Sequence, residues 1–135
     1  MSKVKIRQKV ILFTCNWHAY NSLEAVSREG FTYSTAVVPI RLSCLGRISP
    51  GIILKAFQEG AAGVLLMGCP EGQCHYETGN LEAYKVVEET KPLLKLLGYD
   101  ENRLDYQLLP AESGEKYIEL LNSFLKRVEN GRDKL

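Results

Sequence analysis

The sequence lacks any apolar run long enough to cross a bilayer, and the apolar residues after its basic first segment are too few for a signal-peptide core. It also lacks a strong net charge of either sign, since 17 basic residues and 16 acidic residues leave a formal charge of +1. A nearly neutral protein has no strong field that gathers nucleic acid or anionic lipid. These absences predict a soluble, cytoplasmic protein with no nucleic-acid or membrane partner.

Familiar catalytic patterns are absent as well. The sequence contains neither a glycine-rich nucleotide fingerprint nor a paired-carboxylate site, so we expect no independent catalysis. Without repeats, low-complexity tracts or linkers, the 135 residues predict a single domain over 1–135, with 1–8 and 130–135 as tails that fray. A chain of this length can bury roughly two-thirds of its unfolded surface, so folding need not depend on a metal ion.

Apolar runs punctuated by glycine and proline predict alternating strands and helices. Pro39 indicates that the second strand lies at a sheet edge, and Pro92 is expected to break or kink the third helix. The order of elements predicts a flavodoxin-like or Rossmann-like three-layer α/β sandwich with a mainly parallel sheet of about four to five strands. Strands are predicted over 9–15, 34–42, 63–68 and 104–109, and helices over 23–29, 50–59, 79–98 and 117–128.

All four cysteines lie at or just after the end of a predicted strand. Cys15 ends the first strand, Cys44 follows the second, and Cys69 and Cys74 lie in the loop after the third. Each strand and its crossover helix span roughly 30 residues, and right-handed crossovers bring the carboxyl ends of parallel strands to one edge. We therefore expect the four thiols to converge at that edge, where open α/β sheets place their chemistry.

Four converging thiolates suit more than one cofactor. They satisfy a structural zinc ion or an iron–sulfur cluster of the 2Fe-2S or 4Fe-4S type. Structural zinc usually uses two compact cysteine pairs, whereas here only Cys69 and Cys74 are close in sequence, which favours a cluster. Reduced thiols without metal are a third alternative, although this pair lacks the Cys-x-x-Cys spacing of thiol oxidoreductases. Disulfides are disfavoured in a protein without a secretory signal.

Residues beside the cysteines suit the surroundings of an anionic cluster. A neighbouring arginine offsets negative charge and raises the reduction potential, a histidine donates hydrogen bonds to sulfur, and aromatic rings exclude water. A surface salt bridge explains the arginines equally well. The predicted surrounding residues are Trp17, Arg47, His75 and Tyr76, with Arg41 and His18 as further candidates.

Three cysteine-containing motifs carry a family resemblance. They read TCNW at 14–17, SCLGR at 43–47 and GCPEGQCHY at 68–76. Together with 54–61, 79–80 and 111–116 they resemble the delta subunit of methyl-viologen-reducing hydrogenase over almost the whole chain. The resemblance implies a small protein whose 2Fe-2S cluster is bound by Cys15, Cys44, Cys69 and Cys74.

The resemblance also implies a function. Such a protein relays electrons between a hydrogenase, or another dehydrogenase or reductase, and the FAD-containing, A-type subunit of heterodisulfide reductase, which performs electron bifurcation. The loops 16–22, 44–49 and 72–80 are predicted to dock these partners. A zinc-stabilised docking module of a multisubunit complex is the alternative.

The sequence departs from the family at one motif. Many members carry Cys-Cys-Asn-Trp-Cys where this chain reads Thr14-Cys15-Asn16-Trp17-His18. The four remaining cysteines still complete a ligand set, and His18 is the candidate substitute for a missing cysteine.

Overall fold

The computed structural model describes residues 9–15, 23–24, 26, 28, 30, 36–42, 45–68, 79–108 and 114–133. Within these residues the chain forms one parallel sheet of four strands in the order β2-β1-β3-β4. This is the strand order of the flavodoxin-like fold. The elements are β1 (Val10–Cys15), β2 (Val37–Leu42), η2 (Leu45–Arg47), α2 (Pro50–Gln58), β3 (Gly63–Gly68), α3 (Gly79–Leu96), η3 (Glu101–Arg103), β4 (Leu104–Leu108) and α4 (Gly114–Asp133).

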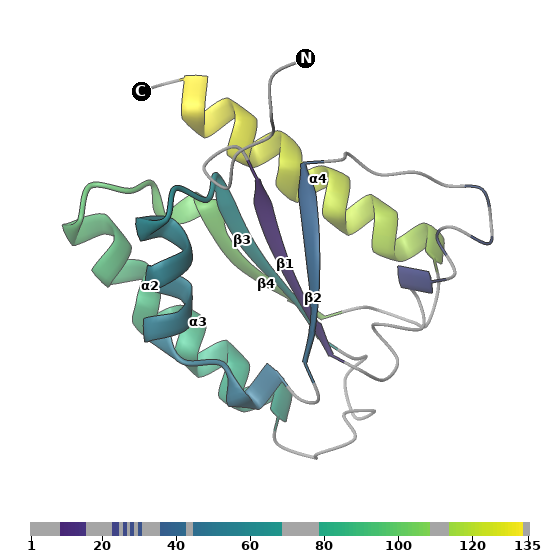
Figure 1. Cartoon of the computed structure of the whole chain (residues 1–135), viewed down its shortest axis with the longest axis horizontal. Coiled ribbons are helices and arrows are strands. Elements are labelled where there is room, and N and C mark those ends of the chain that lie inside the picture. Colours follow the sequence, from purple (N-terminus) through teal and green to yellow (C-terminus); the bar gives the residue numbers. More distant parts are fainter. Residues whose placement is uncertain are drawn as a thin grey trace.

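Helices cover both faces of the sheet. In Figure 1, α2 and α3 lie on one side of the strands and α4 lies on the other. Every residue of β3 is buried, as expected for a central strand with helices on both faces. The predicted three-layer α/β fold with a parallel sheet is therefore confirmed. No helix in the described part of the chain is long and apolar enough to span a membrane.

The helices α2 and α3 begin and end close to their predicted positions, whereas α4 extends beyond the predicted 117–128 at both ends. Ser49 caps α2, since its Oγ accepts a hydrogen bond from the N–H of Ile52 at 3.3 Å, and Pro50 follows in the first turn. A break at Pro92 is not observed, because α3 continues through it to Leu96, and the alternative of a kink there stays a prediction. Pro92 lies on the exposed side, while Val87 and Leu94 are buried on either side of it, so packing holds the helix together.

Outside these helices, the positions 23, 24, 26 and 28 are also helical, as predicted for that segment, and Gly30 follows with a φ of 83°. Glycine adopts this left-handed conformation without strain, which suits the end of a helix.

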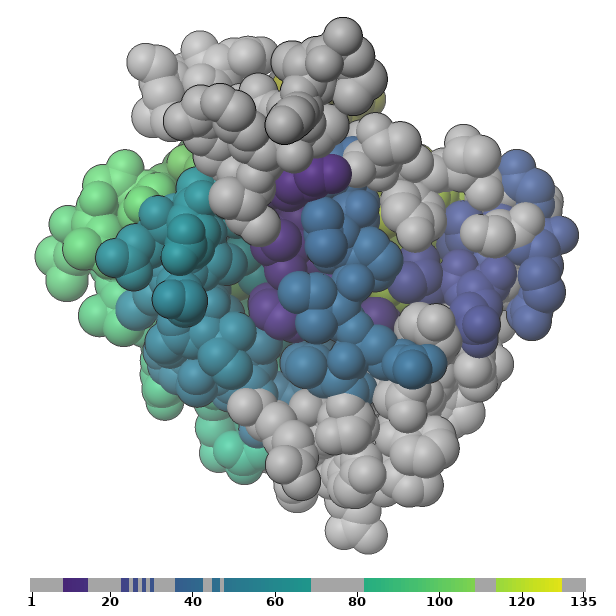
Figure 2. Space-filling model, viewed as in Figure 1, coloured from purple at the N-terminus to yellow at the C-terminus, as the bar shows by residue number. Residues whose placement is uncertain are grey.

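The outer strands of the described sheet, β2 and β4, each carry a feature that blocks further pairing. The N–H of Val10 donates to Ala36 O at 2.9 Å, which fixes which residues of β2 direct their backbone groups toward β1. Successive residues alternate in this direction, so the nitrogen of Pro39 points away from β1. Its missing N–H therefore costs the sheet no hydrogen bond. The predicted edge position of Pro39 is thus confirmed, and Figure 2 shows β2 at the surface beside α2. On β4, the outward N–H of Tyr106 donates to Oδ1 of Asp105 at 2.8 Å.

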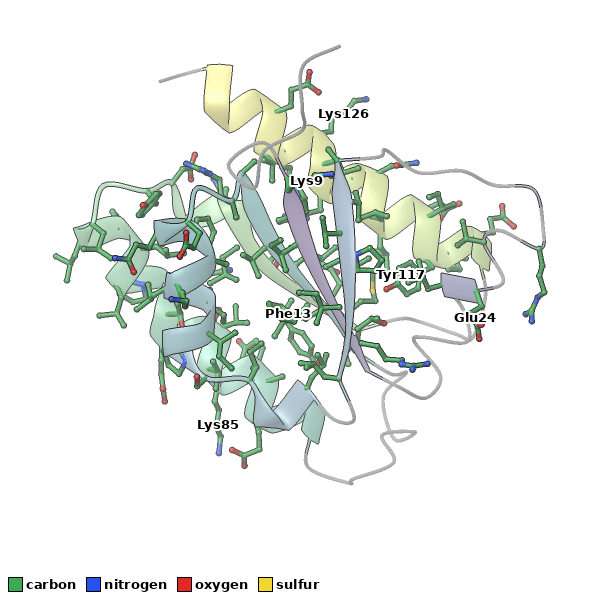
Figure 3. The ribbon with its side chains drawn as sticks, viewed as in Figure 1. Lys9, Phe13, Glu24, Lys85, Tyr117 and Lys126 are labelled. Atoms are coloured by element: carbon green, nitrogen blue, oxygen red, sulfur yellow. The ribbon has the colours of Figure 1, made fainter. Side chains whose placement is uncertain are left out.

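A close contact with α4 fixes which face each residue of β1 occupies. A Cβ atom placed on Gly63 would lie 2.9 Å from Cγ2 of Val128 and 3.3 Å from Cε2 of Phe124, so Gly63 faces α4. Val10 is opposite Gly63 in the register, and side chains alternate along a strand. Val10, Leu12 and Thr14 therefore face α4, whereas Phe13 lies on the side of α2 and α3 (Figure 3).

This contact yields a stability prediction. We expect Gly63→Ala to lower the free energy of unfolding by about 1–3 kcal/mol, because the new methyl group overpacks the interface with α4. Urea unfolding measures the change. Gly51→Ala in α2 is the matched control, since only Ser49 Oγ, at 3.8 Å, lies near its added Cβ. Equal stability of wild type and Gly63→Ala would contradict the packing described.

An arginine joins α2 to the amino ends of β3 and β4. Arg103 Nε donates to Ala62 O at 2.6 Å, and its NH2 group donates to Ala61 O at 3.0 Å. The guanidinium carbon lies 5.6 Å from the centre of the Phe57 ring and 5.5 Å from that of Tyr99, which adds cation–π attraction. The side chain thus satisfies two carbonyl groups at the amino edge of the sheet.

Candidate metal centre at the carboxyl edge of the sheet

The strands that carry or precede three of the cysteines end side by side. Cys15 is the last residue of β1 and pairs with Leu42, the last residue of β2. On the other side of β1, Thr14 pairs with Met67, one residue before the end of β3 at Gly68. All the pairs are parallel, so the three strands reach the same edge at nearly the same level.

The remaining predicted ligands lie outside the described residues, and only their positions in the sequence relate them to this edge. Cys44 comes two residues after Leu42 and directly before η2, while Cys69 directly follows Gly68. Cys74 also lies outside, as do Trp17, His18, His75, Tyr76 and most of the predicted docking loops. The described part of the chain contains no cluster of three or more histidine, cysteine or acidic residues.

The strand order gives this edge a topological switch point. The chain moves from β1 to β2 on one side of β1 and then crosses to β3 on the other side, so the connections after β1 and β3 leave in opposite directions. Such a topological switch point is where open α/β folds bind their ligands. Cys15 ends one of the two strands at the switch point, and Cys69 follows the other.

Helix N-termini are also directed to this side of the sheet. Each of α2, α3 and α4 follows a strand in the chain and returns toward the amino edge, so each begins on the carboxyl side (Figure 1). The N-terminus of a helix carries a partial positive charge of roughly half a unit. In α2 no acidic residue in the first turn offsets this charge, whereas α3 has Glu82 and α4 has Glu115 there. Among the three, the N-terminus of α2 suits a negatively charged group best.

A buried hydroxyl group lies next to the proposed ligand Cys15. Thr14 is 0% exposed, and its Oγ1 has no hydrogen-bond partner within the described structure. A desolvated hydroxyl without a partner is energetically unfavourable. Sequence reasoning noted Thr14 only as part of a motif, because its burial depends on α4, which lies about 100 residues later.

Arg41, a predicted neighbour of the site, is opposite Thr14 in β2 and is exposed. Arg47 ends η2, and its side chain lies outside the described structure. Their predicted roles toward a cluster stay predictions.

A separate hollow lies at the opposite end of the molecule. It has a volume of about 340 Å³ and is lined by Leu54, Gln58, Leu97 and Tyr99, at the ends of α2 and α3. These side chains offer no thiolate, imidazole or carboxylate to a metal ion.

The fold and this edge define a class, the small flavodoxin-like α/β proteins with cysteines at the switch point of the sheet. A comparison with known protein families matches residues 10–130 to the family described as methyl-viologen-reducing hydrogenase, delta subunit. The chain belongs to this family, which confirms the resemblance seen in its cysteine motifs.

Curated relatives cover the same region. The chain is 35% identical over 121 residues to the vhc iron-sulfur subunit of the F420-non-reducing hydrogenase of Methanococcus voltae, covering 90% of this chain and 84% of the relative. It is 34% identical over 120 residues to the vhu iron-sulfur subunit of the corresponding hydrogenase of Methanocaldococcus jannaschii, covering 89% and 90%.

A third relative is a much longer protein. The chain is 34% identical over 120 residues to the A-type subunit of the ferredoxin/F(420)H(2)-dependent CoB-CoM heterodisulfide reductase of Methanosarcina acetivorans, covering 89% of this chain but 15% of that protein. A segment like this chain thus occurs both as a small separate protein and as part of a larger reductase polypeptide.

Proposed function

We propose that this protein is a non-catalytic, cytoplasmic electron-transfer subunit, consisting of a single domain that carries one 2Fe-2S cluster. The observation that carries the proposal is the alignment of β2, β1 and β3 at one edge, with Cys15 in register with the last residue of β2. The proposed ligands are the thiolates of Cys15, Cys44, Cys69 and Cys74.

The described geometry fits such a group. Neighbouring strands lie about 4.8 Å apart, so ligands at three adjacent strand ends come within reach of a cluster a few ångströms across. The helix N-termini on this side of the sheet add partial positive charge. When bound, the cluster supplies one-electron transfer. The residues of the chain hold it with four thiolates, and we assign Trp17, Arg47, His75 and Tyr76 to its surroundings.

The proposed ligand set agrees with a non-catalytic role. Four thiolates complete the coordination of a 2Fe-2S cluster, so no open position is left for a substrate. The protein then contributes by receiving and passing on electrons, and its turnover depends on the partners at either end.

The relatives support two kinds of partner. Two of them are named as hydrogenase iron-sulfur subunits, which supports a hydrogenase, or another dehydrogenase or reductase, on one side. The third carries a similar segment within the A-type subunit of a heterodisulfide reductase, which supports contact with a protein of that type on the other side. We propose that the FAD-containing subunit of an electron-bifurcating heterodisulfide reductase complex is that partner.

Metal and sulfide analysis tests the proposal. The full chain is purified without oxygen, and iron, zinc and acid-labile sulfide are measured together with the visible spectrum. We expect about two irons and two sulfides per chain, with absorbance that bleaches on reduction. One zinc ion without sulfide would contradict the electron-transfer proposal and identify a docking module instead. About four irons and four sulfides would contradict the 2Fe-2S type alone.

A further inference from the structure

Three leucines are exposed together where α3 ends. Leu93, Leu96 and Leu97 are 40%, 84% and 64% exposed. The N–H of Leu97 donates to Leu93 O at 3.1 Å, so helical geometry reaches Leu97, and the spacing i, i+3 and i+4 makes the three residues neighbours on the helix surface. Single exposed apolar side chains need no explanation, whereas a contiguous group is typical of an interaction site. We call these three residues the leucine surface.

The hollow at this end of the molecule adjoins the leucine surface. Leu97 lines it together with Leu54, Gln58 and Tyr99, and its volume is about 340 Å³. Its wall is held in place, since the Tyr99 hydroxyl donates to Phe57 O at 3.3 Å and the two rings lie 5.4 Å apart. A preformed recess therefore lies beside the exposed leucines.

This combination suits an apolar helix face of another protein better than a small molecule. Sites for small molecules fix their ligands with several convergent polar groups, whereas the wall of this recess is mainly apolar and offers the amide of Gln58. Leu93 and Leu96 also extend the apolar area beyond the recess, where a small molecule in the recess does not reach. An amphipathic helix covers such an area with apolar side chains at i, i+3, i+4 and i+7.

Negative charge borders the leucine surface. The helices α2 and α3 both end at this side of the molecule (Figure 1), and each helix C-terminus carries a partial negative charge of roughly half a unit. Glu89 is exposed four residues before Leu93, on the same face of α3, and Asp100 and Glu101 follow directly after Tyr99.

The nearby cations do not offset this charge on the leucine side. Lys91 and Lys95 each lie two residues before a member of the leucine surface, so they lie on the opposite side of α3. Lys55 lies 3.8 Å from Glu59, and Arg103 donates to the carbonyl groups at the amino edge of the sheet. A second copy of this chain would bring like charges together here, whereas a basic partner is attracted.

We propose that the leucine surface docks an amphipathic helix of a partner protein in which lysine or arginine flanks the apolar face. One apolar side chain of that helix fills the recess, and others pack on the exposed leucines. The surface lies at the amino edge of the sheet, so a partner held there leaves the carboxyl edge accessible to a second partner. This docking needs no cluster.

Peptide binding to the full chain, purified without oxygen, tests the docking. The probe is a labelled synthetic helix of about 18 residues, or about five turns, with leucine at i, i+3, i+4 and i+7 and mainly lysine elsewhere. Fluorescence anisotropy measures its Kd. We expect Leu97→Lys to raise the Kd at least about tenfold, because the substitution removes apolar contact and repels the basic peptide.

Ile52→Lys is the matched control. Ile52 is also an exposed apolar residue, at 46%, but it lies in the first turn of α2 and two residues before Leu54, on another side of that helix. This variant should keep the wild-type Kd. A second probe with glutamate in place of lysine should bind the wild type at least about tenfold more weakly.

Hydrogen exchange with and without the basic peptide locates its binding site. Protection should appear at 54–58 and 93–102. Leu97→Lys should unfold at the wild-type temperature, since Leu97 is 64% exposed. If it does not, Leu96→Lys replaces it, because Leu96 is 84% exposed.

Each further outcome bears on a distinct claim. Equal Kd values for wild type and a folded Leu97→Lys, or protection elsewhere in the chain, would overturn the docking site. Equal binding of the two peptides would overturn the basic partner. A wild-type dimer in sedimentation that Leu97→Lys converts to a monomer would assign the surface to a second copy instead. A chain without iron and sulfide would overturn the proposed function and leave the docking site unaffected.

Discussion

Cys15→Ser should lose its iron and sulfide, with at least a roughly tenfold fall in iron per chain and no visible absorbance band. Cys15 is the best placed of the proposed ligands for this test, since its backbone is fixed by pairing with β2 at the end of β1. A serine hydroxyl is a far weaker ligand for iron than a thiolate, and the substitution leaves the ladder hydrogen bonds of the backbone intact. Iron and sulfide assays on protein purified without oxygen measure the effect.

Met67→Leu is the matched control for this experiment. Met67 also bears sulfur, is buried and lies on the strand next to Cys15, but it is not a proposed ligand. The exchange nearly conserves volume, so the iron content should stay at the wild-type level. His18→Ala should likewise keep the cluster. Full iron in Cys15→Ser combined with loss of iron in His18→Ala would show that His18 is a ligand and that the proposed set is wrong.

Arg103→Met should lower the free energy of unfolding by about 3 kcal/mol, because hydrogen bonds from a charged donor contribute about 1.5–3 kcal/mol each. The guanidinium group donates to the carbonyl groups of Ala61 and Ala62, and both residues are buried. Methionine keeps much of the apolar stem against Phe57 but leaves these carbonyls without that donor. Urea unfolding with a constant m-value measures the loss.

Arg127→Met provides the comparison. Arg127 NH2 lies 2.9 Å from Asp105 Oδ2, and its side chain is 44% exposed. An exposed ion pair contributes about 0–1 kcal/mol, so this variant should lose less than about a third of what Arg103→Met loses. Similar losses in the two variants would show that the carbonyl contacts of Arg103 are not what stabilises the amino edge.

Much of the fold follows from local sequence signals. Ser49 and Pro50 mark the start of α2 through capping chemistry, and the apolar run 63–68 between glycines marks a strand buried on both faces. Pro92 does not break α3, because the buried residues on both sides of it keep the helix continuous, whereas the proline rule describes an isolated helix. Tertiary packing overrides a local preference in this case.

The candidate site was predictable only to the level of the sheet edge. The spacing of the cysteines in the sequence predicted that Cys15 and the cysteines after the next two strands share one edge. The observed order places β2 and β3 on either side of β1, which agrees with this prediction. The burial of Thr14 was not predictable, because it depends on the approach of α4, and that approach requires the absence of a side chain at Gly63. Long-range packing of this kind leaves no local signal in the sequence.

The blocked outer strands have a consequence for assembly. An open strand edge is the usual template for runaway association into fibres, and proteins protect it with proline or with local side-chain capping. In this chain Pro39 protects the open edge of β2, and the carboxylate of Asp105 caps an outward N–H group on β4. A protein protected in this way can be present at high concentration without extending its sheet into neighbouring molecules. Contacts with another chain are then left to the helix faces and the strand ends.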